Sequence, residues 1–351
     1  MSTRRTSPTS PDTVRPRAVR VPRLRGTDFL GEGRRGPAPG AGAPHEGNEE
    51  HGEGTMTERG STTVRTGTLE VPGATLYHEV RGAGPVLVLM PGGSADAGLY
   101  GPLAEHLADR WTVLTYDPRC YSRSRLATPV ADQRVEDHSD DVRRLIELVC
   151  PDGERASVFG SSASAVVALD LLSRHPGRLD RVVAHEPPVV EVLPDAPVGR
   201  ALFAEVRAVF RRDGAEAASA TMSAGIGAPG PAVGGDASGT APEGPQEDPA
   251  AELPPPDPEA LRRMHANNPV FLEHMLCPFT GYVPDMTALA AGAERLVLAV
   301  GEESGRQLTA RPVRLLAERL GREAVEFPGG HVGVVQRPAA FAATLREVLG
   351  G

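Results

Sequence analysis

The chain has 351 residues, of which 40% are hydrophobic, and this is enough apolar surface for a large buried core. Its net charge of −9 argues against nucleic acid as a main partner, because phosphate binding needs an excess of basic side chains. The three cysteines are too few and too scattered for a disulfide framework, and no apolar run approaches the ~18 residues that span a bilayer. We therefore expect a cytoplasmic protein without membrane or nucleic-acid partners.

The first segment, residues 1 to about 62, is rich in Arg, Pro, Gly and Thr and has no apolar periodicity. This composition is typical of disorder, so we expect a disordered N-terminal extension. Met56 stands shortly before the first strand pattern, and the sequence leaves open whether translation starts there or at Met1.

Residues 63–187 alternate strand patterns with helix patterns, which predicts a parallel sheet covered by helices on both faces. The run at 86–90 is apolar throughout, as in a strand that is buried on both sides. The strands are expected at 68–71, 75–80, 86–90, 111–116, 156–159 and 179–184. The helices of this part are expected at 99–107, 137–149 and 163–174.

Residues 188–287 interrupt the alternation. Helical patterns at 201–212 and 258–275 flank a stretch of Gly, Pro, Ala and Glu at about 225–256, which predicts a disordered loop. Helices with their own apolar faces, inserted between strands, predict a cap over the sheet. The alternation resumes in residues 288–351, with strands expected at 295–300 and 324–327 and helices at 310–320 and 338–349.

A run of small residues, G-S-S-A-S at 160–164, follows one of the expected buried strands. It is one substitution away from G-x-S-x-G, in which a strand turns sharply into a helix with a nucleophilic serine at the apex. The positions two before and two after this serine must be small, because the two backbones nearly touch there. Gly160 satisfies the first position and Ser164 replaces the second glycine, so Ser162 is the predicted nucleophile. Ser161 fits less well, because a phenylalanine would then occupy the first small position.

Residues from about 68 to 351 resemble the α/β-hydrolase fold superfamily. Besides the G-S-S-A-S run, the resemblance rests on three motifs in chain order, namely M-P-G-G-S at 90–94, D-P-R-C-Y-S-R-S at 117–124 and F-P-G-G-H at 327–331. They are similar to the family's oxyanion-hole loop, its D-x-R-G-x-G-x-S turn and its histidine loop, although Cys120 and Ser122 replace both glycines of that turn. The resemblance implies a doubly wound, mostly parallel α/β sheet with a helical cap inserted after the sixth strand.

The resemblance also implies a serine, a histidine and an acid that act together. A serine hydroxyl is a poor nucleophile until an adjacent base takes its proton, and His331 matches the family's base. A carboxylate must then hold this base in the correct tautomer. Glu303, after the strand at 295–300, is the first choice, because many family members have aspartate there. Glu302 beside it and Glu186, at the end of an earlier strand, are the alternatives.

The tetrahedral intermediate of acyl transfer carries a developing negative charge, which backbone N–H groups can stabilise. One expected donor is the N–H of Ala163, directly after the predicted nucleophile at a helix start. The other is the N–H of Gly93, or alternatively of Ser94, in the loop after the third strand.

These features predict a cofactor-independent serine hydrolase that cleaves a small ester, lactone or thioester through an acyl-enzyme. The alternatives are carbon–carbon bond hydrolysis or perhydrolase activity on the same groups, and a non-catalytic ligand-binding protein of this fold. We expect no cofactor and no metal, because the sequence has no glycine-rich phosphate loop and no His/Cys cluster with metal-ligand spacing. The expected partner is a small-molecule substrate, and the sequence leaves its identity and the oligomeric state open.

Overall fold

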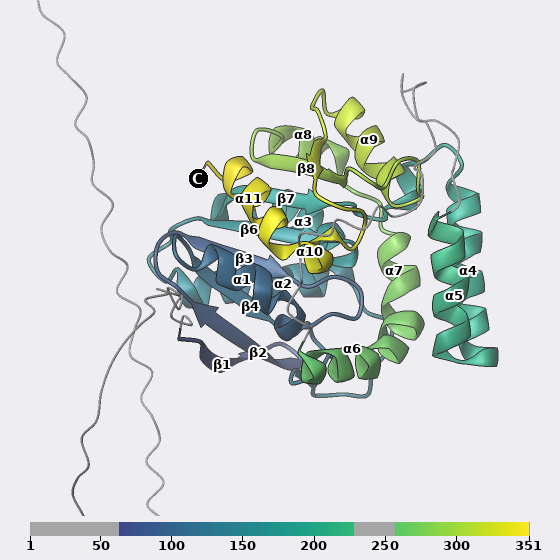
Figure 1. Cartoon of the computed structure of the whole chain (residues 1–351), viewed down its shortest axis with the longest axis horizontal. Coiled ribbons are helices and arrows are strands. Elements are labelled where there is room, and N and C mark those ends of the chain that lie inside the picture. Colours follow the sequence, from purple (N-terminus) through teal and green to yellow (C-terminus); the bar gives the residue numbers. More distant parts are fainter. Residues whose placement is uncertain (1–62, 228–256, 351) are drawn as a thin grey trace, which may run out of the picture. The chain divides into compact units, whose positions relative to one another are not determined.

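The computed structural model describes residues 63–227 and 257–350 of the chain. Within them the strands are β1 (Arg65–Val71), β2 (Ala74–Arg81), β3 (Val86–Met90), β4 (Thr112–Tyr116), β5 (Arg125–Leu126), β6 (Ala156–Ser161), β7 (Leu179–His185), β8 (Leu296–Gly301) and β9 (Val325–Phe327). They form one nine-stranded sheet in the order β1-β2-β4-β3-β6-β7-β8-β9, with β5 paired to β2 (Figure 1).

The sheet is mostly parallel, as the sequence predicted. Strands β3, β4, β6, β7, β8 and β9 pair in parallel, whereas β1 and β5 pair with β2 in antiparallel fashion and β2 does so with β4. From β3 the chain passes to β4 on one side, and it then returns to place β6 on the other side. Such a reversal opens a crevice at the carboxyl ends of the two central strands, where open α/β sheets bind their ligands.

Helices cover both faces of the sheet. The core helices are α1 (Gly101–Leu107), α2 (Val135–Val149), α3 (Ala163–Arg174), α8 (Met286–Ala291), α9 (Ala310–Arg319), α10 (Gly333–Gln336) and α11 (Pro338–Val348). Alternate side chains of β3 enter two different hydrophobic clusters: Val88 joins one with side chains of α2 and α3, and Leu89 joins the other with side chains of α1 and α11. The apolar run of β3 is therefore explained by burial on both faces. In Figure 1, α1 and α11 lie over the near face.

A group of helices lies between β7 and β8, and we call residues 196–227 and 257–280 the cap. It consists of α4 (Ala196–Asp213), α5 (Ala215–Gly227), α6 (Pro258–Val270), a π-helical turn (Phe271–Met275) and α7 (Leu276–Thr280). Helix α4 packs against α5 and α7, beside the carboxyl ends of the strands (Figure 1).

Most expected strands and helices are confirmed, but the cap differs in detail. Of the residues expected in a loop at about 225–256, residues 225–227 instead form the last turn of α5. Gly225 permits this: a Cβ there would lie 2.3 Å from a side-chain carbon of Leu202, so the glycine lets α5 approach α4 closely. The rest of that loop and the expected N-terminal extension lie outside the described residues. The sequence did not predict α5, α7, α8, α10 or the short strand β5.

Candidate active site

Ser162 stands at the sharp turn between β6 and α3. Its backbone has φ 56° and ψ −122°, a left-handed conformation that is strained for a non-glycine residue. Gly160 explains how the turn closes, because a Cβ at this position would lie 2.4 Å from the carbonyl oxygen of Ser164. The strand and the helix therefore approach each other as closely as the elbow motif requires, and the side chain of Ser162 lines the cavity described below.

Ser164, which replaces the second glycine of the motif, has a structural role in this turn. Its hydroxyl donates to the carbonyl oxygen of Met90 at 2.6 Å and accepts from the backbone N–H of Ser161 at 3.0 Å. Met90 is the last residue of β3, so this hydroxyl connects the elbow to the neighbouring central strand. A serine here thus satisfies buried polar groups that a glycine would leave without this partner.

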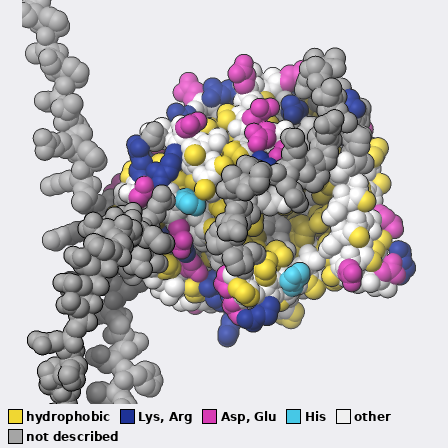
Figure 2. All heavy atoms as spheres, viewed as in Figure 1, with side chains coloured by type: hydrophobic (Ala, Val, Ile, Leu, Met, Phe, Trp, Pro, Cys, Tyr) yellow, Lys and Arg dark blue, Asp and Glu magenta, His cyan; other side chains and the backbone are white. Residues whose placement is uncertain are grey.

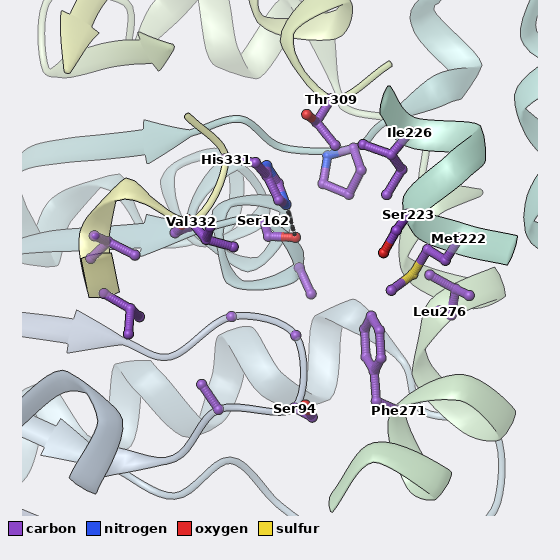
Figure 3. Close-up of a pocket in the computed structure, with 18 of the residues that line it drawn as sticks. Ser94, Ser162, Met222, Ser223, Ile226, Phe271, Leu276, Thr309, His331 and Val332 are labelled. Carbon is purple, nitrogen blue, oxygen red and sulfur yellow. Dashed lines mark hydrogen bonds between the residues drawn. The ribbon is translucent and has the colours of Figure 1, made fainter. Parts of the chain in front are cut away.

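His331, on the loop after β9, connects Ser162 to a buried carboxylate. Its Nε2 lies 3.1 Å from Oγ of Ser162 (Figure 3). Its Nδ1 lies 2.7 Å from Oε2 of Glu186. An ionised carboxylate can only accept hydrogen bonds, so Nδ1 carries the imidazole proton. In the neutral imidazole, Nε2 is then the nitrogen that can accept from the serine hydroxyl, which is the tautomer that a general base requires.

Glu186 follows β7 directly and is completely buried, with a positive φ of 48°. Its Oε1 accepts from the backbone N–H of Gly301 at 2.9 Å, and its Oε2 also accepts from the hydroxyl of Thr309 at 2.9 Å. Burial alone raises the pKa of this carboxyl, but the hydrogen bond and the charge of His331 outweigh burial and lower the pKa to about 2. The group is therefore ionised and fixed in place.

The prediction that Glu303 orients His331 is wrong, because Nδ1 of His331 bonds to Glu186 instead. The side chain of Glu303 is 50% exposed and bonds to Arg337 at 2.6 Å. Glu302 is also turned to the surface, where it accepts from the N–H of Gly329 at 3.2 Å. Of the three carboxylates proposed from the sequence, Glu186 alone is hydrogen-bonded to the histidine in the described part of the chain.

Ser161, the alternative nucleophile, is buried below the elbow. Its hydroxyl lies 3.0 Å from Nδ1 of His185, a buried histidine whose ring packs against Phe327 and Phe341. Burial lowers the pKa of His185 to about 4, so this imidazole is neutral near neutral pH. We interpret this second serine–histidine pair as part of the core packing.

The two expected oxyanion donors come from different parts of the fold, the start of α3 and the loop after β3. Ala163 is the first residue of α3, where a backbone N–H has no acceptor within its own helix. Gly93 belongs to residues 91–95, which we call the oxyanion loop, and its φ of 57° suits glycine. The neighbouring Gly92 packs on the elbow so closely that a Cβ would lie 2.0 Å from the carbonyl oxygen of Ser161. Gly93 and Ala163 both border the cavity, and their role as an oxyanion hole stays a prediction.

A cavity of about 640 Å³ lies between the carboxyl ends of the central strands and the cap. In Figure 3, Val332 lies on one side of Ser162, and the cap side chains Met222, Ile226 and Phe271 lie on the other. No Arg, Asp or Glu is among the described residues that line the cavity. Its polar side chains include Ser94, Tyr100, Ser162, Ser223, Asn268, Thr280, Gln307, Thr309, His331 and Gln336.

The outer surface contrasts with this uncharged interior. Figure 2 shows acidic and basic side chains interspersed over the visible face, without a large area of one sign. Within residues 63–227 and 257–350, no helix is both long and apolar enough to cross a membrane. In the same part of the chain, no three His, Cys, Asp or Glu side chains lie together as metal ligands would.

A serine, a histidine and a buried carboxylate joined by hydrogen bonds at the carboxyl ends of parallel strands are the arrangement found in α/β-hydrolases. Comparison with known proteins agrees, since residues 85–224 match the family model described as alpha/beta hydrolase fold. The chain is also 32% identical over 293 residues to the protein named uncharacterized hydrolase YraK of Bacillus subtilis, an alignment that covers 82% of this chain and 97% of that relative. The chain therefore belongs to the α/β-hydrolase fold family.

Solved structures show the same fold at low sequence identity. A thermophilic esterase from Thermogutta terrifontis is 18% identical with a TM-score of 0.60, over 82% of this chain and 98% of that one. The enol-lactonase from Burkholderia xenovorans LB400 is 18% identical with a TM-score of 0.55, over 81% of this chain and all of that one (100%). The doubly wound α/β fold predicted from the sequence is thus confirmed.

Proposed function

We propose that this protein is a serine hydrolase that cleaves a small, uncharged ester, lactone or thioester through an acyl-enzyme. The observation that carries the proposal is the continuous line of hydrogen bonds from Ser162 through His331 to Glu186, with distances of 3.1 Å and 2.7 Å. The carboxyl of Glu186 is ionised, as the residue that orients the base must be, and the serine hydroxyl borders a cavity large enough for a small molecule.

The first half of the reaction acylates Ser162. Nε2 of His331 takes the hydroxyl proton while Oγ attacks the substrate's carbonyl carbon, and the carbonyl π electrons move onto the oxygen. The resulting oxyanion accepts hydrogen bonds from the N–H groups of Gly93 and Ala163, which stabilise the transition state. The imidazolium then protonates the leaving alcohol or thiol as the tetrahedral intermediate collapses. Glu186 stabilises the imidazolium and keeps its ring in the required orientation.

The second half releases the acyl group. A water molecule gives its proton to Nε2 of His331 and attacks the acyl carbon. This forms a second oxyanion, which accepts hydrogen bonds from the same N–H groups of Gly93 and Ala163. The intermediate collapses when the proton returns to Oγ of Ser162, and the carboxylic acid leaves.

The character of the cavity favours an uncharged substrate. A charged group that entered it would lose hydration, and no Arg, Asp or Glu among the described lining residues would compensate for that loss. The apolar walls, including Phe203, Phe271 and Phe279, instead stabilise hydrocarbon. We therefore expect catalytic efficiency to rise with the length of an aliphatic acyl chain until the cavity is full.

The test combines labelling with a substrate series. The full-length protein is treated with a fluorophosphonate and assayed with p-nitrophenyl esters of graded acyl length, together with a carboxylate-bearing ester of matched size. We expect labelling and turnover that both disappear in Ser162→Ala, and a strong preference for the uncharged esters. Absence of labelling by several serine-directed probes would overturn the proposal. Equal turnover of the charged ester would refute the substrate class alone.

A further inference from the structure

We propose that Asn267, on the cap helix α6, is a positioning residue that holds the oxyanion loop in its active shape. The inference rests on the proposed function, because it assigns a task within the same reaction. A buried polar network connects the cap to the loop after β3, and it includes Ser122, which departs from the family's turn motif.

Every hydrogen-bonding atom of the Asn267 side chain is used between cap and core. Its Nδ2 donates to the carbonyl oxygen of Ser94 at 3.0 Å and to the hydroxyl of Ser122 at 2.9 Å. Its Oδ1 accepts from the backbone N–H of Ser122 at 2.9 Å. The residue is 3% exposed, so water does not compete for these bonds. A buried amide that is satisfied in this way has one orientation, and it fixes the groups that it contacts.

Ser122 occupies one of the two glycine positions of the D-x-R-G-x-G-x-S turn. Its φ of 48° lies in the region that favours glycine, as does the φ of 67° at Cys120, the other replaced position. The Ser122 hydroxyl donates to Oδ2 of Asp96 at 2.9 Å while it accepts from Asn267. Cys120 packs partly against the hydrophobic core. The strained backbone at Ser122 is therefore combined with a side chain that joins the loop after β3 to the cap.

The network contacts the oxyanion loop next to Gly93, whose N–H must keep a fixed direction to act as an oxyanion donor. Gly93, the expected oxyanion donor, has no side chain to limit its backbone conformation. Its carbonyl oxygen accepts from the hydroxyl of Tyr121 at 3.0 Å, and the next carbonyl, that of Ser94, accepts from Asn267. Asp96, the residue directly after this loop, is completely buried and pairs with Arg263 of α6. The core thus holds one peptide plane of the loop and the cap holds the next.

This arrangement predicts that Asn267 affects the chemical step more than substrate binding. Loss of its amide leaves Tyr121 as the one of these two side chains that still holds the loop, so the backbone around Gly93 is fixed less firmly and its N–H points less precisely at the oxyanion. An oxyanion donor acts mainly in the transition state, so its displacement lowers kcat and leaves KM nearly unchanged. A residue that only shaped the cavity wall would instead change KM.

A set of variants distinguishes the effect of the Asn267 hydrogen bonds on the oxyanion loop from an effect on the stability of the cap. Asn267→Ala removes all three bonds, whereas Asn267→Asp keeps the acceptor for the Ser122 N–H and loses the donor to Ser94. Ser122→Gly removes the whole side chain, including the hydroxyl that contacts Asn267, and relieves the backbone strain at φ 48°. Two matched controls are Cys120→Gly, which relieves the same backbone strain, and Arg262→Ala, which alters an exposed position of α6.

Each variant is assayed for kcat and KM on the best ester, for affinity for phenylboronic acid, and for its thermal unfolding midpoint. Boronic acids form a tetrahedral adduct with the nucleophilic serine that imitates the intermediate. We expect both Asn267 variants to lose about tenfold or more in kcat and in boronate affinity, with KM within about twofold. Ser122→Gly should show a smaller loss of kcat and of boronate affinity. Both controls should match the wild type in kcat and in boronate affinity.

Unchanged kcat in the Asn267 variants, or a loss confined to KM, would overturn the inference while the proposed function stands. If Asn267→Ala does not fold, Asn267→Asp and Ser122→Gly decide the question by the same readouts. Failure of the proposed function is seen separately, because the wild type itself would then show neither turnover nor Ser162 labelling.

Discussion

Replacement of Glu186 by glutamine is the sharpest test of the site, because it removes a charge and keeps the shape. The structure determines how the new amide would lie. The backbone N–H of Gly301 is bonded to Oε1, and a buried N–H left without an acceptor costs about 1–3 kcal/mol. The amide oxygen therefore stays with Gly301, and the amide nitrogen takes the place of Oε2, which lies 2.7 Å from Nδ1 of His331.

An N–H directed at Nδ1 of His331 selects the wrong imidazole tautomer. Nδ1 becomes the acceptor, Nε2 carries the proton, and the ring can no longer take the proton of Ser162. The loss of the correct tautomer in a serine–histidine–acid site lowers kcat by about 10⁴-fold. We expect kcat/KM of Glu186→Gln to fall by about 10³–10⁴-fold, with the chain still folded because the Thr309 hydroxyl can accept the second amide N–H.

The assay is ester turnover at neutral pH, with circular dichroism and thermal unfolding to verify the fold. Glu303→Gln is the matched control, because it makes the same chemical change on the surface beside Arg337, and its activity should stay within about twofold of the wild type. Retention of more than about a tenth of the activity by Glu186→Gln would refute this reasoning, since tautomer selection predicts a far larger loss. So would an equal loss in Glu303→Gln.

Three further predictions concern the elbow and its surroundings. Ser164→Ala removes the hydroxyl that donates to the carbonyl oxygen of Met90, so the free energy of unfolding in urea titrations should fall by about 1–3 kcal/mol. An unchanged value would contradict the role given to this hydroxyl. Gly92→Ala places a Cβ 2.0 Å from the carbonyl oxygen of Ser161, so the oxyanion loop must move and kcat should fall by about 100-fold in the ester assay; near-normal kcat would show that the loop tolerates the shift. Burial lowers the pKa of His185 from 6.5 to about 4, so its contribution to stability is complete above 6.5 and is lost as the pH falls toward 4. The wild type should lose unfolding free energy as the pH falls from about 7 to about 5, and in His185→Asn this loss should be smaller by about 2 kcal/mol. An equal loss in variant and wild type would contradict this.

The parallel sheet could be predicted from the sequence because its strands carry their own signal. Continuous apolar runs such as Val86–Met90 are found where both faces of a strand are covered, and the structure buries every residue of this strand. The cap gave weaker signals. Helix α5 (Ala215–Gly227) contains two glycines near its end, which argue against a helix unless the close neighbour at Leu202 is known.

The candidate site was predicted in part. Ser162 and His331 stand in local motifs, and the structure brings them within hydrogen-bond distance. The acid could not be assigned with the same ease, because Glu186 and Glu303 both follow strands and the sequence does not reveal which strand end reaches the histidine. One signal did distinguish them: Glu186 lies in the apolar stretch V-V-A-H-E-P-P-V-V, and a carboxylate that is buried among such residues requires a partner.

The bond from Asn267 to the Ser94 carbonyl has a practical consequence for protein engineering. Caps are natural targets for transplantation, because they enclose the cavity while the sheet carries the reacting groups. In this chain, a graft that replaces α6 also removes the amide on which the loop after β3 depends, so the donor cap has to bring an equivalent group. Substitutions at Met222 and Ile226 on α5 reshape the cavity wall and leave that contact intact, which makes them the better starting points for a new substrate range.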